Sequence, residues 1–172
     1  MKKHTDRYFY PDQYNNPANW QAHFNGTERE IFEQTQGKVT HFIASTGTSG
    51  TLMGVARRLK QKNPAIRIAA VQPDSPMHGI EGTKHMASTI PPGIYDPSLI
   101  DDVIPVSTDE AYGTANELAK KAGLFVGISS GANVAGALKY AEKLGTDDVV
   151  VTILCDNGFR YLSTDLWGAS NA

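Results

Sequence analysis

Two glycine-containing stretches of the sequence hold the residue types that bind anions. The first, Ser45-Thr46-Gly47-Thr48-Ser49-Gly50-Thr51, lies between an apolar run at 39–44 and a helix-like segment at 51–62. Glycine lets the backbone turn tightly and approach a ligand, hydroxyl groups donate hydrogen bonds, and the first turn of a helix offers unpaired N–H groups. The stretch predicts a cradle for a phosphate ester that needs neither a lysine nor a metal. From the pattern alone, a tight turn without a ligand is the alternative.

The second stretch is Gly127-Ile128-Ser129-Ser130-Gly131-Ala132, which leads into a helix expected at 131–144. One face of that helix carries small residues, which allow close packing against a sheet. Ser129 or Ser130 is a suitable helix cap. Alternatively, the two serines divide the work, with one capping the helix and the other facing a ligand.

Neither glycine stretch has the spacing of a common nucleotide-binding motif. The first lacks the lysine of a Gly-x-x-x-x-Gly-Lys-Ser/Thr loop, and its glycine spacing departs from Gly-x-Gly-x-x-Gly. A monophosphate is therefore favoured over ATP or NAD. The histidines show no metal-ligand spacing, so no metal site is expected. Cys155 follows a predicted strand without an obvious base, which favours a packing role over a nucleophilic one.

The overall composition excludes several classes of partner. The 172 residues are 40% hydrophobic, enough for a sizeable core, and their net charge of -2 gives no basic field for nucleic acid. No apolar run approaches the roughly 20 residues of a membrane-spanning helix, and the N-terminus lacks the apolar core of a signal peptide. A single cysteine, Cys155, rules out an intrachain disulfide and fits a reducing cytoplasm.

The hydrophobic pattern predicts strands that alternate with helices. Strands are expected at 39–44, 66–71, 103–106 and 149–154, and helices at 51–62, 109–122 and 131–144. Capping boxes are expected at Thr27-x-x-Glu30 and Ser107-x-x-Glu110, with Gly37 and Gly123 ending helices. The β-branched run at 149–154 suits a strand buried on both faces. These elements predict an α/β fold with a doubly wound, mostly parallel sheet in three αβα layers.

Ligands of such sheets bind beyond the carboxyl ends of the strands, where the following loops meet. Three loops are therefore candidates for chemistry: 45–51, 72–100 and 127–131. The middle one is longer than a connector requires, and its glycines and prolines fit either a functional lid or an irregular surface segment.

Several motifs together resemble the cysteine synthase and cystathionine β-synthase family of pyridoxal-phosphate enzymes. They are the aromatic and asparagine-rich segment 8–19, the glycine loop 46–54, the segment 127–132, and Gly158-Phe159-Arg160-Tyr161-Leu162-Ser163-Thr164. The segments 36–42 and 153–156 look most like the B-type cysteine synthases. The match covers nearly the whole chain in the order of the family, and it implies the tryptophan-synthase-β-like fold of these enzymes.

The resemblance assigns roles to individual residues. It implies that the cofactor phosphate binds Gly47, Thr48, Ser49, Gly50 and Thr51, and that Ser129 bonds the pyridine nitrogen. Ser49 occupies a position that is often glycine in the family. Ile80-Glu81-Gly82 matches the place where family members bring a loop over the substrate, which makes Gly82 a substrate-binding candidate. The implied division is a remnant of the small domain with the crossover segment at 1–38, and a large cofactor-phosphate domain at 39–172.

The resemblance also indicates what the chain lacks. Family members hold the cofactor as a Schiff base on a lysine in a Ser-x-Lys-Asp-Arg-like segment, which does not occur here, so no catalytic residue is assigned. We expect the C-terminal half of a β-replacement enzyme that makes cysteine from an activated serine such as O-acetylserine, inactive alone and complemented by an N-terminal half. Apolar surface around Tyr8–Tyr14, Trp20 and Phe24 would favour a homo-oligomer such as a dimer.

Two other readings remain at this point. One is a non-catalytic module that binds phosphate esters or proteins. The other is a fragment of a cystathionine β-synthase or of a serine or threonine dehydratase; the set of motifs disfavours the dehydratase.

Overall fold

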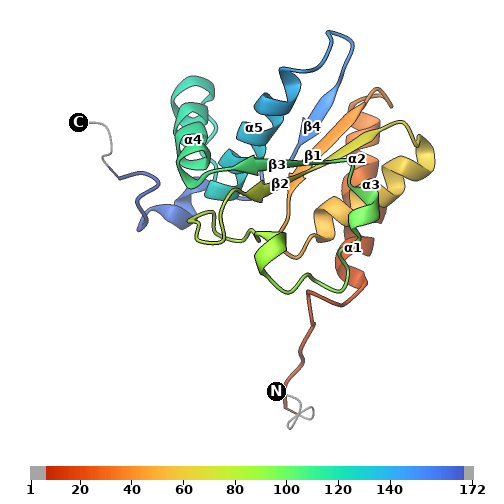
Figure 1. Cartoon of the computed structure of the whole chain (residues 1–172), viewed down its shortest axis with the longest axis horizontal. Coiled ribbons are helices and arrows are strands. Elements are labelled where there is room, and N and C mark those ends of the chain that lie inside the picture. Colours follow the sequence, from red (N-terminus) through yellow and green to blue (C-terminus); the bar gives the residue numbers. More distant parts are fainter. Residues whose placement is uncertain (1–6, 169–172) are drawn as a thin grey trace.

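The computed structural model describes residues 7–168 and shows a four-stranded parallel sheet with helices on both faces (Figure 1). The strand order is β3-β2-β1-β4, and neighbouring strands pair in parallel. The strands are β1 (His41–Ser45), β2 (Arg67–Pro73), β3 (Asp102–Val106) and β4 (Val150–Thr152).

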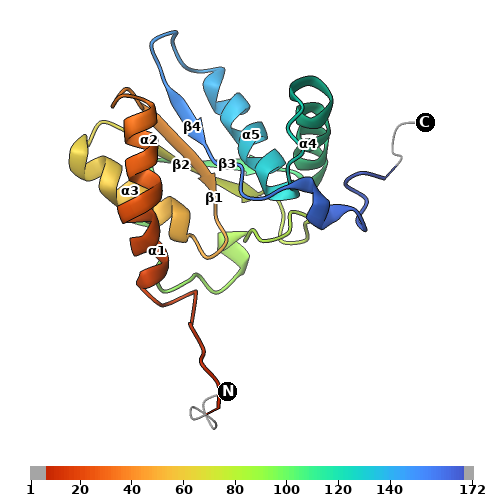
Figure 2. The same cartoon turned by 180° about the vertical axis from the view of Figure 1, so that it is seen from behind.

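The helices form two layers on opposite faces of this sheet (Figures 1 and 2). One layer comprises α1 (Ala18–Ala22), a π-helical segment (His23–Thr27), α2 (Glu28–Gln34) and α3 (Gly50–Lys62). The other comprises α4 (Thr108–Ala122) and α5 (Ile128–Ala141). The predicted three-layer, doubly wound α/β fold is confirmed.

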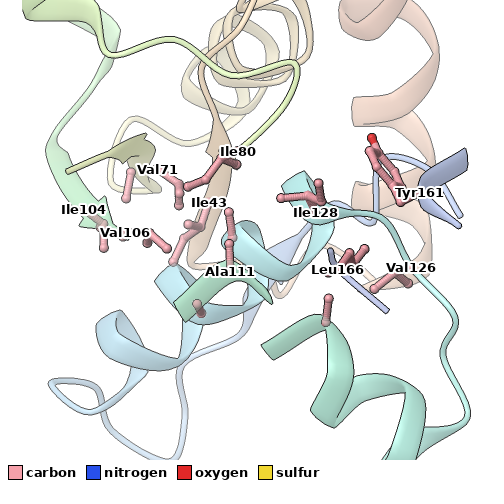
Figure 3. Close-up of a cluster of buried hydrophobic side chains, with 14 residues drawn as sticks. Ile43, Val71, Ile80, Ile104, Val106, Ala111, Val126, Ile128, Tyr161 and Leu166 are labelled. Atoms are coloured by element: carbon pink, nitrogen blue, oxygen red, sulfur yellow. The ribbon is translucent and has the colours of Figure 1, made fainter. Parts of the chain in front are cut away.

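Alternation of side chains along β1 divides the core between the two layers. Phe42 packs with residues of α2 and α3, whereas Ile43 packs with residues of α4 and α5, and both side chains are fully buried. Figure 3 shows the second cluster, in which Ile43, Val71 and Val106 come from three neighbouring strands. The sheet is thus fixed from both sides, and its loops start from a rigid base.

Small residues bring α5 very close to its neighbours, as the sequence indicated. A Cβ atom on Gly131 would lie 2.1 Å from the carbonyl oxygen of Ala111 in α4, and one on Gly136 would lie 2.5 Å from a methyl carbon of Val71 in β2. Neither position has room for a side chain. Helix α5 is therefore held tightly against α4 at its first turn and against the sheet further along its length.

The helix ends match the predictions at some positions and not at others. Ser107 and Glu110 form the predicted reciprocal capping box, and Gly37 and Gly123 adopt positive φ at the ends of their helices. The capping box predicted at Thr27 is wrong, because Thr27 lies inside a continuous helical segment and its hydroxyl instead bonds His23. The helix predicted from residue 131 begins at Ile128, so Ser129 and Ser130 lie in its first turn and neither caps it.

Two predictions about burial are also corrected. The last strand is shorter than expected, and its residues are half-buried rather than buried on both faces. The reason is its place at the edge of the sheet, where no strand from residues 7–168 pairs with its outer side. Trp20 and Phe24 are partly buried because Arg57 and Arg58 of α3 cover their rings. The aromatic segment before them is exposed, with Phe9 at 89%.

Within residues 7–168, none of the helices combines the length and the apolar character that a membrane span requires.

Candidate functional site

A cavity of about 340 Å³ lies at the carboxyl ends of β1 and β4. Its volume falls within the usual range for small-ligand sites. All seven residues that the sequence singled out for binding line it: Gly47, Thr48, Ser49, Gly50, Thr51, Gly82 and Ser129. The two glycine stretches and the middle loop, which are far apart in the sequence, therefore share one cavity.

One residue of the first glycine stretch, Ser49, has a strained backbone conformation. Ser49 has a φ of 69°, in the left-handed region that L-residues other than glycine rarely adopt. The residue is only 3% exposed, and its hydroxyl oxygen has no hydrogen-bond partner. A buried hydroxyl without a partner is costly, so this atom is suited to bonding a ligand.

The glycines of the stretch are required by packing against the protein itself. A Cβ on Gly47 would lie 2.2 Å from the carbonyl oxygen of Gly82, and one on Gly50 would lie 1.8 Å from the side-chain oxygen of Asn19. Thr46 adds two bonds to the middle loop, since it donates from its hydroxyl to the Lys84 carbonyl at 3.0 Å and accepts from the Lys84 amide at 2.7 Å. The middle loop therefore covers the glycine stretch directly.

The two serines of α5 have different surroundings. The Ser130 hydroxyl accepts a hydrogen bond from the Cys155 amide at 2.8 Å and lies 3.4 Å from the Asp156 carbonyl, to which it donates. Ser130 thereby fixes the segment after β4 against the start of α5. Ser129 is buried and lines the cavity. One serine supports the site and the other faces it, and neither caps the helix as one alternative had it.

Among the polar cavity residues that the sequence did not single out for binding, two have a buried oxygen without a partner. Asn133 is fully buried and donates to the Ile153 carbonyl at 2.8 Å, while its side-chain oxygen has no partner. Asp156 accepts a hydrogen bond from the Tyr161 hydroxyl at 2.8 Å through one carboxylate oxygen, and its other oxygen is buried without a partner.

Sequence signals for both residues existed. Asn133 follows Ser129 by four positions, which places the two on one face of a helix. Asp156 lies just beyond the carboxyl end of the last predicted strand, where ligands of parallel sheets bind.

Burial governs the ionisation of two groups that line the cavity. It raises the pKa of the Cys155 thiol, and the Asp156 carboxylate adds to this effect, so the thiol stays protonated at neutral pH even though part of the residue reaches solvent. Burial and the bond to Asp156 raise the pKa of the Tyr161 hydroxyl well above its ordinary value. Tyr161 therefore acts as a hydrogen-bond donor to Asp156. Among the residues that the structure describes, no lysine lines the cavity.

The histidines among residues 7–168 form hydrogen bonds with residues near them instead of gathering at one point. His23 bonds Thr51 and Thr27, whereas His41 bonds Thr40. In residues 7–168, the acidic, histidine and cysteine side chains form no group that could hold a metal ion.

A family model described as pyridoxal-phosphate dependent enzyme matches residues 1–156 of the chain. The chain therefore belongs to the family of pyridoxal-phosphate dependent enzymes. Among curated relatives, the cysteine synthase of Aquifex aeolicus (strain VF5) is 51% identical over 170 residues, covering 97% of this chain and 52% of the relative. Cysteine synthase B of Escherichia coli (strain K12) is 44% identical over 157 residues, covering 91% of this chain and 51% of the relative.

Solved structures agree with this assignment. A cysteine synthase from Entamoeba histolytica superposes with a TM-score of 0.91 at 36% identity, covering 99% of this chain and 52% of that one. An O-acetylserine dependent cystathionine beta-synthase from Helicobacter pylori gives a TM-score of 0.82 at 38% identity, covering 91% and 53%. The predicted resemblance is confirmed, and the chain spans about half the length of the curated relatives it matches.

Proposed function

We propose that this chain carries the cofactor-phosphate side of a pyridoxal-phosphate site in a cysteine synthase-like β-replacement enzyme. The observation that carries the proposal is the buried Ser49 hydroxyl, which has no partner and lies in a loop whose other residues also line the cavity. A ligand oxygen at that place satisfies a group that the protein leaves unsatisfied.

The residues of the cavity suit a phosphate monoester. The loop leads into α3, a helix of 13 residues whose first N–H groups lack helical acceptors, and Thr48 and Thr51 add hydroxyl donors. Because these donors are neutral, the phosphate would be held by backbone and hydroxyl bonds rather than by a cationic side chain. Gly47, Thr48, Ser49, Gly50 and Thr51 are the proposed phosphate ligands.

Ser129 is the proposed partner of the pyridine nitrogen. A hydroxyl bonds this nitrogen without holding it protonated, as a carboxylate would. When bound, the cofactor supplies an electron sink for the α-carbon of an amino-acid substrate. Ser129 would limit how strongly that sink draws electrons, which favours loss of a substituent from the β-carbon. Asp156 also lines the cavity, but one of its carboxylate oxygens already accepts a hydrogen bond from Tyr161.

The middle loop is the proposed substrate side of the site. Gly82 lines the cavity with a φ of 81°, and its carbonyl packs on Gly47 of the glycine loop. We assign Gly82 to binding a small amino-acid substrate such as O-acetylserine. Residues 39–172 would form the large cofactor-phosphate domain, and residues 1–38 would form the crossover from a smaller domain.

We assign the Schiff-base lysine that this chemistry requires to a segment outside residues 7–168. A complementing N-terminal half is the proposed source, in a cytoplasmic homodimeric enzyme. The absence of lysine from the described cavity lining supports this assignment. A non-catalytic module that binds phosphate esters is the competing function, and the following experiment separates the two.

The purified chain is titrated with pyridoxal phosphate, pyridoxal and inorganic phosphate, and binding is followed by absorbance and calorimetry. We expect pyridoxal phosphate to bind at least tenfold more tightly than pyridoxal, since the phosphate loop supplies most of the affinity. Equal affinity for the two would contradict the proposal. The Gly113→Ala variant is a matched control, because Gly113 is exposed and a Cβ there meets nothing.

The second step adds the separately expressed N-terminal half of the Escherichia coli relative and measures cysteine formed from O-acetylserine and sulfide. We expect activity with the added half and none without it. Activity of the chain alone, or a covalent label on one of its own lysines after borohydride reduction with the cofactor, would overturn the assignment of the lysine. If the chain binds phosphate but shows no activity after the N-terminal half is added, the non-catalytic module is favoured.

A further inference from the structure

A chain of hydrogen bonds links the phosphate loop to the π-helical segment His23–Thr27. The Thr51 hydroxyl lies 3.2 Å from Nε2 of His23, and Nδ1 of the same ring lies 2.9 Å from the Thr27 hydroxyl. Thr51 lines the cavity, whereas His23 and Thr27 do not. His23, outside the cavity, therefore contacts one of its donors, and Thr27 in turn bonds His23.

Close packing gives this link a fixed geometry. A Cβ on Gly54, one turn after Thr51, would lie 2.2 Å from the Trp20 carbonyl and 2.7 Å from Cβ of His23. The two helices touch through their backbones at this point, so the backbone and Cβ of His23 are held against α3. The ring is half-buried, and burial lowers the pKa of His23. At neutral pH the ring carries one proton, and which nitrogen holds it decides what Thr51 can do.

The hydroxyl of Thr51 has one hydrogen to donate. If Nε2 of His23 accepts that hydrogen, the hydroxyl has none left for an anion in the cavity. If Nε2 carries the ring proton, it donates to Thr51 and leaves the threonine hydrogen free to bond a phosphate oxygen. In this second arrangement Nδ1 is unprotonated and accepts from the Thr27 hydroxyl. Thr27 then donates to Nδ1, Nε2 donates to Thr51, and Thr51 donates to the anion.

We propose that His23 is a positioning residue of the phosphate site, which presents the Thr51 hydroxyl as a donor to the anion in the tautomer that carries its proton on Nε2 and accepts from Thr27 at Nδ1. The inference rests on the proposed function of the glycine loop and extends it to residues outside the cavity. The ligand class is a phosphate dianion, and the contribution of His23 is made entirely through Thr51.

Variants with matched geometry test the direction of the relay. His23→Gln places an amide N–H where Nε2 lies, whereas His23→Asn places its amide near Nδ1 and cannot reach Thr51. We expect His23→Asn and Thr51→Val each to weaken binding of pyridoxal phosphate and inorganic phosphate about tenfold, the loss typical of one bond to a charged group. His23→Gln should retain affinity within about threefold of the wild type. The loss of affinity in Thr27→Val should lie between those of His23→Gln and His23→Asn. The double variant His23→Asn/Thr51→Val should bind no more weakly than Thr51→Val alone.

A second measurement keeps the proposal independent of folding. The ¹⁵N chemical shifts of the His23 ring distinguish a protonated nitrogen from an unprotonated one. We expect Nε2–H with Nδ1 unprotonated when inorganic phosphate is bound. A ring protonated at Nδ1, additive losses in the double variant, or unchanged affinity in His23→Asn would each overturn the role of His23 while leaving the proposed function intact. Failure of the wild-type chain to bind either ligand would overturn both.

Discussion

The two ends of the sheet treat polar groups in opposite ways. At the amino ends of β2 and β3, Lys60 bonds Asp101 at 2.8 Å, and Asp102 accepts from Arg67 at 3.0 Å and from Tyr140 at 2.6 Å. At the carboxyl ends, three buried side-chain oxygens of the described residues have no partner: those of Ser49, Asn133 and Asp156. One end is built for stability, and the other keeps unsatisfied atoms around a cavity.

Backbone strain differs between the two ends in its burial. At the carboxyl end, the left-handed Ser49 is buried and lines the cavity near the contact between Gly47 and Gly82. Positive φ angles also occur at Gln36 and Gly37, in the turn before β1 at the amino end, but both residues are exposed. Strain in a buried residue of a cavity is of the kind that persists where it supports function.

The largest expected effect comes from filling the closest contact of the cavity. The Gly47→Ala substitution places a Cβ 2.2 Å from the Gly82 carbonyl, so the loop must shift. We expect the dissociation constant for pyridoxal phosphate to rise about 100-fold, which corresponds to about 2.7 kcal/mol. Titration of the variant beside Gly113→Ala, whose affinity should equal that of the wild type, checks the prediction. Equal affinity in both variants would remove the special status of the carboxyl end.

The next effect acts on stability and leaves binding unchanged. Asp101 accepts from Lys60 and from the Ile68 amide, so Asp101→Ala leaves the Ile68 amide without this acceptor and leaves Lys60 only its bond to the Ile66 carbonyl. We expect the free energy of unfolding to fall by about 2 kcal/mol. Urea denaturation measures this change, with the exposed Asp147 replaced by alanine as the control. A change of more than threefold in cofactor affinity would contradict the proposed separation between the two ends.

A pH series isolates the charge at the amino end. Burial alone would raise the pKa of Asp101, but the hydrogen bonds from Lys60 and the Ile68 amide and the charges of Lys60 and Arg67 bring that pKa below its ordinary value of 3.8. The stabilisation is therefore complete above the unfolded pKa and is lost as the pH falls through the folded pKa. Urea unfolding at pH 6 and pH 3 should show a wild-type advantage over Asp101→Asn that shrinks in acid. A constant advantage would mean that the carboxylate charge contributes nothing.

The smallest effect concerns the strained serine. Ser49→Gly relieves the left-handed φ but gives the unfolded chain more freedom, so we expect the ligand-free protein to gain only about 0.5 kcal/mol. Its affinity for phosphate should fall a few-fold because the hydroxyl is gone. Ser49→Ala is the matched control, since it removes the hydroxyl and keeps the strain. If both variants bind phosphate as the wild type does, the unpartnered hydroxyl has no role in binding.

Local signals predicted the elements of this fold well. Apolar runs and glycine or proline boundaries gave the strands and helices within a few residues, and the capping box at Ser107 is complete in local sequence. The capping box at Thr27 was predicted wrongly because its local pattern matches that at Ser107. Thr27 lies in a helical segment that begins before it, and its hydroxyl bonds His23. The edge position of β4 depends on which strands lie beside it, and the residues of β4 do not encode that.

The candidate site was partly predictable for similar reasons. Gly47 and Gly50 were found because the loop motif is contiguous, but the sequence does not show that they pack on Gly82 and Asn19. The left-handed conformation of Ser49 and the bond between Tyr161 and Asp156 arise from tertiary packing. Residues brought together by the fold from separate loops leave no spacing for a motif to capture.

The π-helical segment also bears on how insertions and deletions are read along this chain. Its wider turn contains an additional residue relative to an α-helix, so the π segment completes about the same rotation as an α-helical turn with one residue fewer. Removing one residue from His23–Thr27 would therefore leave an α-helix of nearly the same length and phase. Asn19 and Trp20 would still face Gly50 and Gly54 while Ile31 stays in the core. A one-residue gap at this position in an alignment therefore corresponds to loss of the wider turn, without a change in helical phase on either side.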